Sequence, residues 1–161
     1  MPYLKLMKLL YLADRRAIEL YGSPITFDSY VSMKRGPVLS TTLDIIKSPP
    51  EPESHMPGVS WNEHICREGY DVVLQSEPRS VLSPADVAIS DEVFAQYGAI
   101  DQWELADLTH TLPEWRDPGN GALPLEYEDI LAALGVKREI AEETLSRLRT
   151  QALLEDYARN N

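Results

Sequence analysis

The chain has 161 residues, enough for one domain that builds its own hydrophobic core. Hydrophobic residues make up 43% of it and charged residues 25%, which excludes a disordered or collagen-like chain. Fifteen basic residues face 26 acidic ones, and the net charge of −11 disfavours nucleic acid as a partner. The charge is uneven. Residues 1–47 hold seven basic and four acidic residues, whereas residues 48–136 hold three basic and seventeen acidic ones.

The cellular compartment follows from cysteine content and hydropathy. Cys66 is the single cysteine, so no disulfide can form within the chain, which is typical of a reducing compartment. No apolar run approaches the ~18 residues of a membrane span. We therefore expect a cytoplasmic protein with no membrane partner.

Apolar residues at helical spacing predict a first helix over residues 3–21, ended by Gly22. The helix is apolar on most sides, which is typical of a buried, central helix. Its predicted polar strip consists of Lys5, Lys8, Arg15 and Glu19.

Residues 28–34 alternate as in a strand, and Gly36-Pro37 predicts the start of a second helix with proline in its first position. Four prolines in residues 48–60 predict an exposed loop. Residues 61–75 resemble a β-hairpin turning at Arg67-Glu68-Gly69. We expect this hairpin and the strand near 29–34 to form one small antiparallel sheet.

The rest of the chain is predicted to be helical apart from a loop at residues 113–124. Ser83-Pro84 caps a helix that Gly98 ends, with Val87, Phe94 and Tyr97 inside. Further helices are predicted over 101–110, 126–134 and 138–157. The inner stripe of the last helix is Ile140, Thr144, Leu148 and Ala152. The predicted fold class is α+β, a predominantly helical single domain over residues 1–161 with a small antiparallel sheet.

Catalytic motifs and phosphate loops are missing from the sequence. His64 and Cys66 lie two residues apart on a predicted strand, but further metal ligands would have to come from distant segments, so we expect no metal and no cofactor. Glu104, Asp107 and His110 lie close together on one short helix and keep a small hydrolase or metalloenzyme open as an alternative. A DNA-binding regulator is a further alternative, and it requires Lys5, Lys8, Lys34 and Arg35 to share one face.

Lys34-Arg35-Gly36-Pro37 places two cations beside a predicted helix N-terminus, where free N–H groups can receive an anion. This basic turn is a candidate site for an acidic side chain or a terminal carboxylate of a partner. The alternative is an ordinary turn with two exposed cations.

Four segments resemble motifs of the SocA-like antitoxin family, also called the Panacea domain. The segments are Lys5–Asp14, Ser32–Val38, Leu108–His110 followed by Trp115, and Leu125–Ile130. The resemblance implies a predominantly helical, non-enzymatic antitoxin of a bacterial or phage toxin–antitoxin system. Its partner would be a cognate toxin protein. The antitoxin would either only occlude this toxin or also act as a proteolytic adaptor that delivers it to an ATP-dependent protease.

Six residues are the predicted partner-binding residues: Lys34, Arg35, Gly36, Pro37, His110 and Trp115. Within this set we expect Gly36 and Pro37 to be structural, together with Leu10 and Tyr11 of the first helix.

Overall fold

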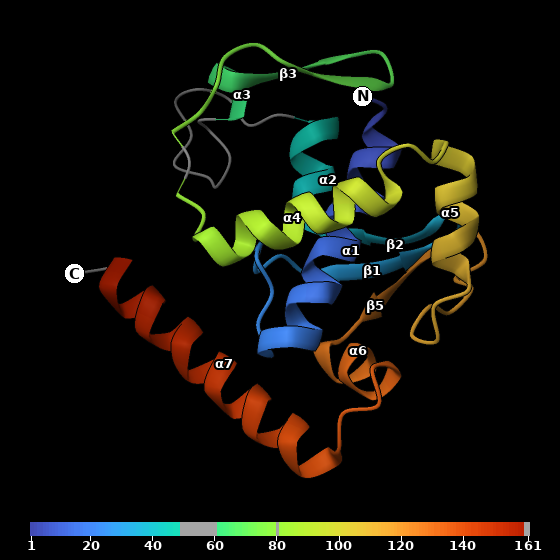
Figure 1. The fold of residues 1–161 in the computed structure, drawn as a ribbon. Helices are drawn as coiled ribbons and strands as arrows, with labels where there is room; N and C mark the ends of the chain where they lie inside the picture. The colour runs from blue at the N-terminus through green and yellow to red at the C-terminus, as the bar shows by residue number, and fades with distance from the viewer. Residues whose placement is uncertain (49–60, 80, 160–161) are drawn as a thin grey trace.

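The computed structural model describes residues 1–48, 61–79 and 81–159, arranged around one central helix (Figure 1). In chain order its elements are α1 (Tyr3–Tyr21), β1 (Tyr30–Met33), β2 (Gly36–Leu39), α2 (Ser40–Lys47), α3 (Trp61–His64), β3 (Ile65–Glu68), β4 (Asp71–Leu74), α4 (Pro84–Tyr97), α5 (Gln102–His110), β5 (Ala122–Leu125), α6 (Tyr127–Ala133) and α7 (Arg138–Arg159). The predicted α+β class, mostly helical with small antiparallel sheets, is confirmed. None of the helices in the described ranges combines the length and apolar character needed to cross a membrane.

Helix α1 is the centre of the fold because it contributes to each of the three clusters of buried side chains among the described residues. Leu12 packs with α4 and α5, Tyr11 with the sheet and α6, and Met7 with β2 and α2. The prediction of a buried, central helix is confirmed, and so is its end at Gly22, which has a φ of 65°. The predicted polar strip is wrong at Lys8, which is fully buried.

Strands β2, β1 and β5 form a three-stranded antiparallel sheet in that order. The hairpin β3–β4 forms a separate two-stranded sheet, so the predicted pairing of this hairpin with β1 is wrong. The second neighbour of β1 is β5, which lies partly inside the predicted loop 113–124. The hairpin itself is shorter than predicted: residues 61–64 are helical, and the chain turns at Gly69-Tyr70.

The prediction that a helix starts at Gly36-Pro37 is wrong. Both residues belong to β2, and α2 begins only at Ser40. The φ of Gly36 is 88°, a conformation that lets the chain turn back and pair with β1. Proline is tolerated there because β2 is an edge strand of its sheet.

The helices predicted from caps lie close to where they were expected. Ser83 and Asp86 form a capping box at α4, and Asp101 accepts a hydrogen bond from the Trp103 backbone N–H. Two predictions of buried faces need correction. The inner residues of α4 are Ile89 and Val93, whereas Val87 and Phe94 are exposed. In α7, Ile140 is exposed, and Ala141 and Leu145 pack against the core instead.

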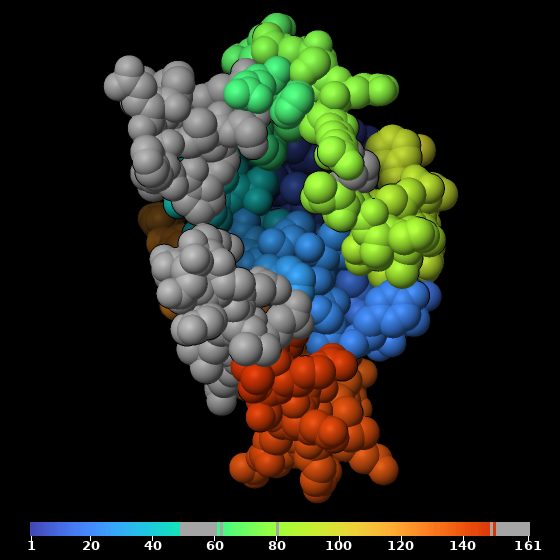
Figure 2. Space-filling view, turned by 90° about the vertical axis from the view of Figure 1, so that its left-hand side faces the viewer, coloured from blue at the N-terminus to red at the C-terminus, as the bar shows by residue number. Residues whose placement is uncertain are grey.

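Figure 2 shows a hollowed face of the molecule, on which side chains of α1 and α2 lie at the bottom between α4 and the segment that carries β3 and β4. Of the predicted proline-rich loop, residues 49–60 lie outside the described residues.

Candidate partner-binding surface

Lys34 and Arg35 form the turn between β1 and β2, and both are exposed. The guanidinium carbon of Arg35 lies 4.4 Å from the ring centroid of Trp103, a residue of α5 that is 49% exposed. This cation–π contact fixes the turn against α5 while leaving a cation and an aromatic face accessible. Trp103 is a member of the surface that the sequence did not single out as a site residue.

The other side of the turn is held by Trp115. Its indole Nε1 donates a hydrogen bond to the Met33 carbonyl at 3.1 Å. The ring of His110 lies against the Trp115 ring, with centroids 4.5 Å apart. The structure therefore brings His110 and Trp115 together beside the basic turn, although they are distant from it in sequence. We refer to Lys34, Arg35, Trp103, His110 and Trp115 as the turn surface.

The base of the turn is buried and tightly packed. Lys8 of α1 donates a hydrogen bond from Nζ to the Pro37 carbonyl at 2.7 Å. A Cβ added to Gly36 would overlap Thr109 Oγ1 and lie 3.0 Å from Lys8 Nζ. Gly36 and Pro37 are buried, so they position the turn and offer little surface for direct contact.

Lys8 is a lysine in an unusual environment, since burial lowers its pKa from 10.5 to about 7. The sequence places Lys8 between Met7 and Leu9, and all three are buried in the structure. Apolar residues cover most sides of α1, so a lysine between Met7 and Leu9 has little exposed surface to occupy. This wide apolar sector is the sequence feature that could have indicated a buried Lys8.

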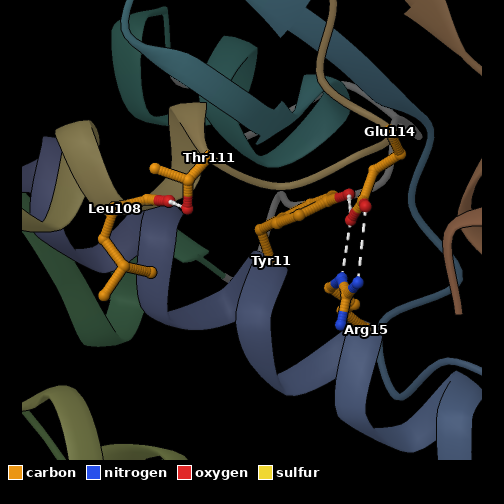
Figure 3. Close-up of polar contacts among 5 residues, drawn as sticks. All are labelled: Tyr11, Arg15, Leu108, Thr111 and Glu114. Atoms are coloured by element: carbon orange, nitrogen blue, oxygen red, sulfur yellow. Dashed lines mark hydrogen bonds and ion pairs between the residues drawn. The ribbon is translucent and has the colours of Figure 1, made fainter.

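The chain just before Trp115 is held by the carboxylate of Glu114, which faces Tyr11 and Arg15 (Figure 3). Glu114 is buried, and its Oε1 accepts hydrogen bonds from Tyr11 Oη at 2.9 Å and from Arg15 Nε at 2.6 Å. Burial raises the pKa of Tyr11, and the neighbouring Glu114 carboxylate raises it further. This clamp ties the segment after α5 to the central helix. Tyr11 therefore has the structural role that was expected for it.

A second buried carboxylate, Asp14, holds the segment between α1 and β1. It accepts hydrogen bonds from the Ile25 and Thr26 N–H groups at 2.9 Å each and from Tyr30 Oη at 2.9 Å. Burial raises the pKa of Asp14, opposed by these hydrogen bonds. Asp14 lies below the surface and stabilises the approach to β1.

The proposed anion site at a helix N-terminus beside the basic turn is wrong. Helix α2 starts four residues after Gly36, and its first N–H groups already have an acceptor. Asp28 receives hydrogen bonds from the Thr41 N–H at 2.9 Å and the Thr42 N–H at 2.8 Å. An anion at the turn would therefore contact the side chains of Lys34 and Arg35 rather than this helix end.

The structure does not assemble Glu104, Asp107 and His110 into a catalytic group. Glu104 and Asp107 are exposed, the Asp107 carboxylate lies 3.9 Å from His110 Nδ1, and the His110 ring faces Trp115. His64 Nδ1 lies 2.7 Å from Ser76 Oγ rather than beside Cys66 in a ligand set. Within the described ranges, no three His, Cys, Asp or Glu side chains are grouped to hold a metal ion.

The DNA-binding alternative required four cations on one face. Lys8 is fully buried, and Lys5 donates from Nζ to the Gly98 carbonyl at 2.6 Å. Two of the four cations are thus engaged with backbone carbonyls of the protein, which removes the predicted basic face.

Comparison with known families gives the class of this protein. The family model described as "Antitoxin SocA-like, Panacea domain" matches residues 6–116. This range covers more than half of the chain, and the chain belongs to the SocA-like antitoxin (Panacea domain) family. The matched residues include the second and third motifs of the resemblance, all of the first motif except Lys5, and every residue of the turn surface, whereas Leu125–Ile130 lies beyond them. Comparison with curated proteins and with solved structures gave no match.

Proposed function

We propose that this protein is an antitoxin that neutralises a cognate toxin protein by direct, non-catalytic binding. The family membership over residues 6–116 is the observation that carries the proposal. The neutralising unit is a single domain over residues 1–161 that acts in the cytoplasm. In support of one unit, α6 and α7 pack on the same buried cluster as α1 and the sheet.

The turn surface is the proposed contact region. Arg and Trp side chains are enriched where interfaces gain most of their binding energy. Arg35 and Trp103 are exposed and stacked on each other, and Trp115 and Lys8 anchor the turn from below. Because the turn is fixed before binding, little conformational entropy is lost when a partner docks.

Two modes of neutralisation are compatible with this surface. Binding can occlude the toxin, or it can be followed by delivery to an ATP-dependent protease, as an adaptor would do. Toxin half-life separates them: occlusion leaves it unchanged when the antitoxin is expressed, whereas delivery shortens it only in cells that contain the protease.

Co-expression with the reading frame adjacent to this gene tests the proposal. We expect that frame to arrest growth alone and growth to recover when this protein is expressed. The double variant Lys34→Glu/Arg35→Glu should lose the rescue. Lys137→Glu/Arg138→Glu is the matched control because it reverses two neighbouring exposed cations outside the turn surface. A frame that is harmless alone, or that stays toxic beside the wild-type protein, would contradict the proposal.

A further inference from the structure

A small groove lies beside the basic turn, between α1, the β1–β2 hairpin and α2. Its volume is about 240 Å³. Buried side chains of Met7, Val38 and Leu43 form its apolar base. The groove is smaller than the ~300–1,000 Å³ of typical pockets for whole small ligands, so its size suits one or two protein side chains.

The rim of this groove is cationic, although the protein as a whole has a net charge of −11. Lys34, Arg35 and Lys47 line it, and no described lining residue carries a carboxylate. Residues 1–13 and 29–43, which supply most of the lining, contain no Asp or Glu. Lys34 and Arg35 form no ion pair with any other residue of the described ranges. Their charges therefore remain available to a partner.

The rim is held in place by buried contacts rather than by the partner. Lys8 donates to the Pro37 carbonyl on one strand of the hairpin, and Trp115 donates to the Met33 carbonyl on the other. Arg35 is further fixed by its contact with Trp103. The distance between the apolar base and the cations is therefore set before binding, which favours a partner with matching spacing.

We infer that this groove receives an acidic segment of the toxin, in which an apolar side chain is flanked by carboxylates. The inference rests on the proposed function and specifies the chemistry of the partner at the same site. The apolar side chain displaces water from Met7, Val38 and Leu43, and the flanking carboxylates pair with Lys34 and Arg35. Because these cations are exposed, they contribute mainly to association rate and salt dependence.

Charge and shape favour this occupant over two others. A nucleic-acid strand would pair its phosphates with the rim but leave the apolar base unused, and the remaining surface repels it through the excess of acidic residues. A second copy of this chain is a further possible occupant, since residues 48–136 are strongly acidic. Both are outcomes that the following experiment detects.

The experiment uses the full chain labelled with ¹³C at its methionine methyl groups. Met7 and Met33 line the groove, and Met1 lies outside its lining, so the methyl signals report directly on occupancy. The probe is the capped peptide Glu-Glu-Leu-Phe-Glu-Glu, and the control peptide has lysine in place of each glutamate. We expect the acidic peptide to shift the Met7 and Met33 signals saturably and the lysine peptide to leave them unchanged.

Variants and competitors decide between the occupants. Lys34→Glu/Arg35→Glu should weaken the acidic peptide at least about tenfold, the equivalent of about 1.4 kcal/mol, whereas Lys137→Glu/Arg138→Glu should not. No shift at Met7 and Met33 at millimolar peptide would overturn the inference. Shifts of the Met7 and Met33 signals on addition of single-stranded DNA would also overturn the inference, because the occupant would then be nucleic acid. Shifts that depend only on the concentration of the protein would overturn it too, because the occupant would then be a second copy of the chain.

Failure of this inference is distinguishable from failure of the proposed function. If the peptide does not bind but the wild-type protein still rescues growth from the toxin, the groove is not the docking site and the antitoxin function stands. If the peptide binds but no toxin is neutralised, the proposed function is wrong, and the assignment of the groove to a toxin segment is wrong with it.

Discussion

Replacing Lys8 with methionine tests the buried base of the turn through the pH dependence of stability. Methionine keeps a long, unbranched side chain but removes the charge and the hydrogen bond to the Pro37 carbonyl. Burial lowers the pKa of Lys8 in the folded protein from 10.5 to about 7. Between these two values the unfolded chain binds a proton at Lys8 and the folded chain does not, so the free energy of unfolding rises with pH.

The size of the effect follows from the two pKa values. Between pH 7 and pH 9 the wild-type protein should gain about 2 kcal/mol of unfolding free energy relative to Lys8→Met. Other titrating groups are common to both proteins and cancel in the comparison. Well below pH 7 Lys8 is protonated in both states, so the difference should become constant.

Urea denaturation followed by tryptophan fluorescence at pH 6, 7, 8 and 9 measures this difference. Lys137→Met is the control, because it replaces an exposed lysine outside the buried base of the turn by the same residue. A gap between wild type and Lys8→Met that is the same at pH 7 and pH 9 would refute the idea of a desolvated lysine beneath the turn.

Three further substitutions test other parts of the structure. Gly36→Ala should destabilise the protein more than Gly69→Ala in thermal unfolding: both have a positive φ, which costs about 1–2 kcal/mol, but only a Cβ at Gly36 meets other atoms. Glu114→Ala should lower the free energy of unfolding by about 3 kcal/mol. This is the low end of the range for a broken buried ion pair, because Arg15 is partly exposed to solvent. A loss below about 1 kcal/mol in urea titrations would contradict a stabilising contact of Glu114 with Tyr11 and Arg15. Asp28→Ala should cost about 1–2 kcal/mol through the loss of the acceptor at the α2 N-terminus, and Asp28→Asn should recover part of it in the same assay.

Local signals in the sequence predicted most of the helices because each carries its own start or stop. The capping box at Ser83 and Asp86 and the positive φ at Gly22 are decided by residues next to each other in the chain. The strands were harder because their partners are distant in sequence. Strand β5 pairs with β1 across some ninety intervening residues, and neither strand alone indicates that partner. Gly36-Pro37 fits both a helix start and an edge strand, and only its pairing with β1 decides between them.

For the turn surface, too, the sequence indicates individual residues but not how they lie relative to one another. The basic turn, His110 and Trp115 could be selected from the sequence because they stand in motifs that resemble one family. Their juxtaposition depends on tertiary contacts: the Trp115 hydrogen bond to Met33 and the stacking of His110 on Trp115. The sequence does not predict Trp103 as a residue of this surface, since nothing in its local sequence distinguishes a core tryptophan from one that lies under Arg35.

Buried polar side chains were the least predictable feature. Lys8, Asp14 and Glu114 are polar by type and buried by position. Each is buried because a partner far along the chain satisfies its hydrogen bonds: Pro37 for Lys8, Tyr30 for Asp14, and Tyr11 for Glu114. Such pairs become visible only once the chain is folded.

The most direct test of the central claim is a calorimetric titration of the purified protein with the purified product of the adjacent reading frame. The account predicts a saturable complex for the wild-type protein, binding at least about tenfold weaker for Lys34→Glu/Arg35→Glu, and unchanged binding for Lys137→Glu/Arg138→Glu. No complex with the wild-type protein would contradict the antitoxin function. Equal binding by all three proteins would contradict the turn surface as the contact region.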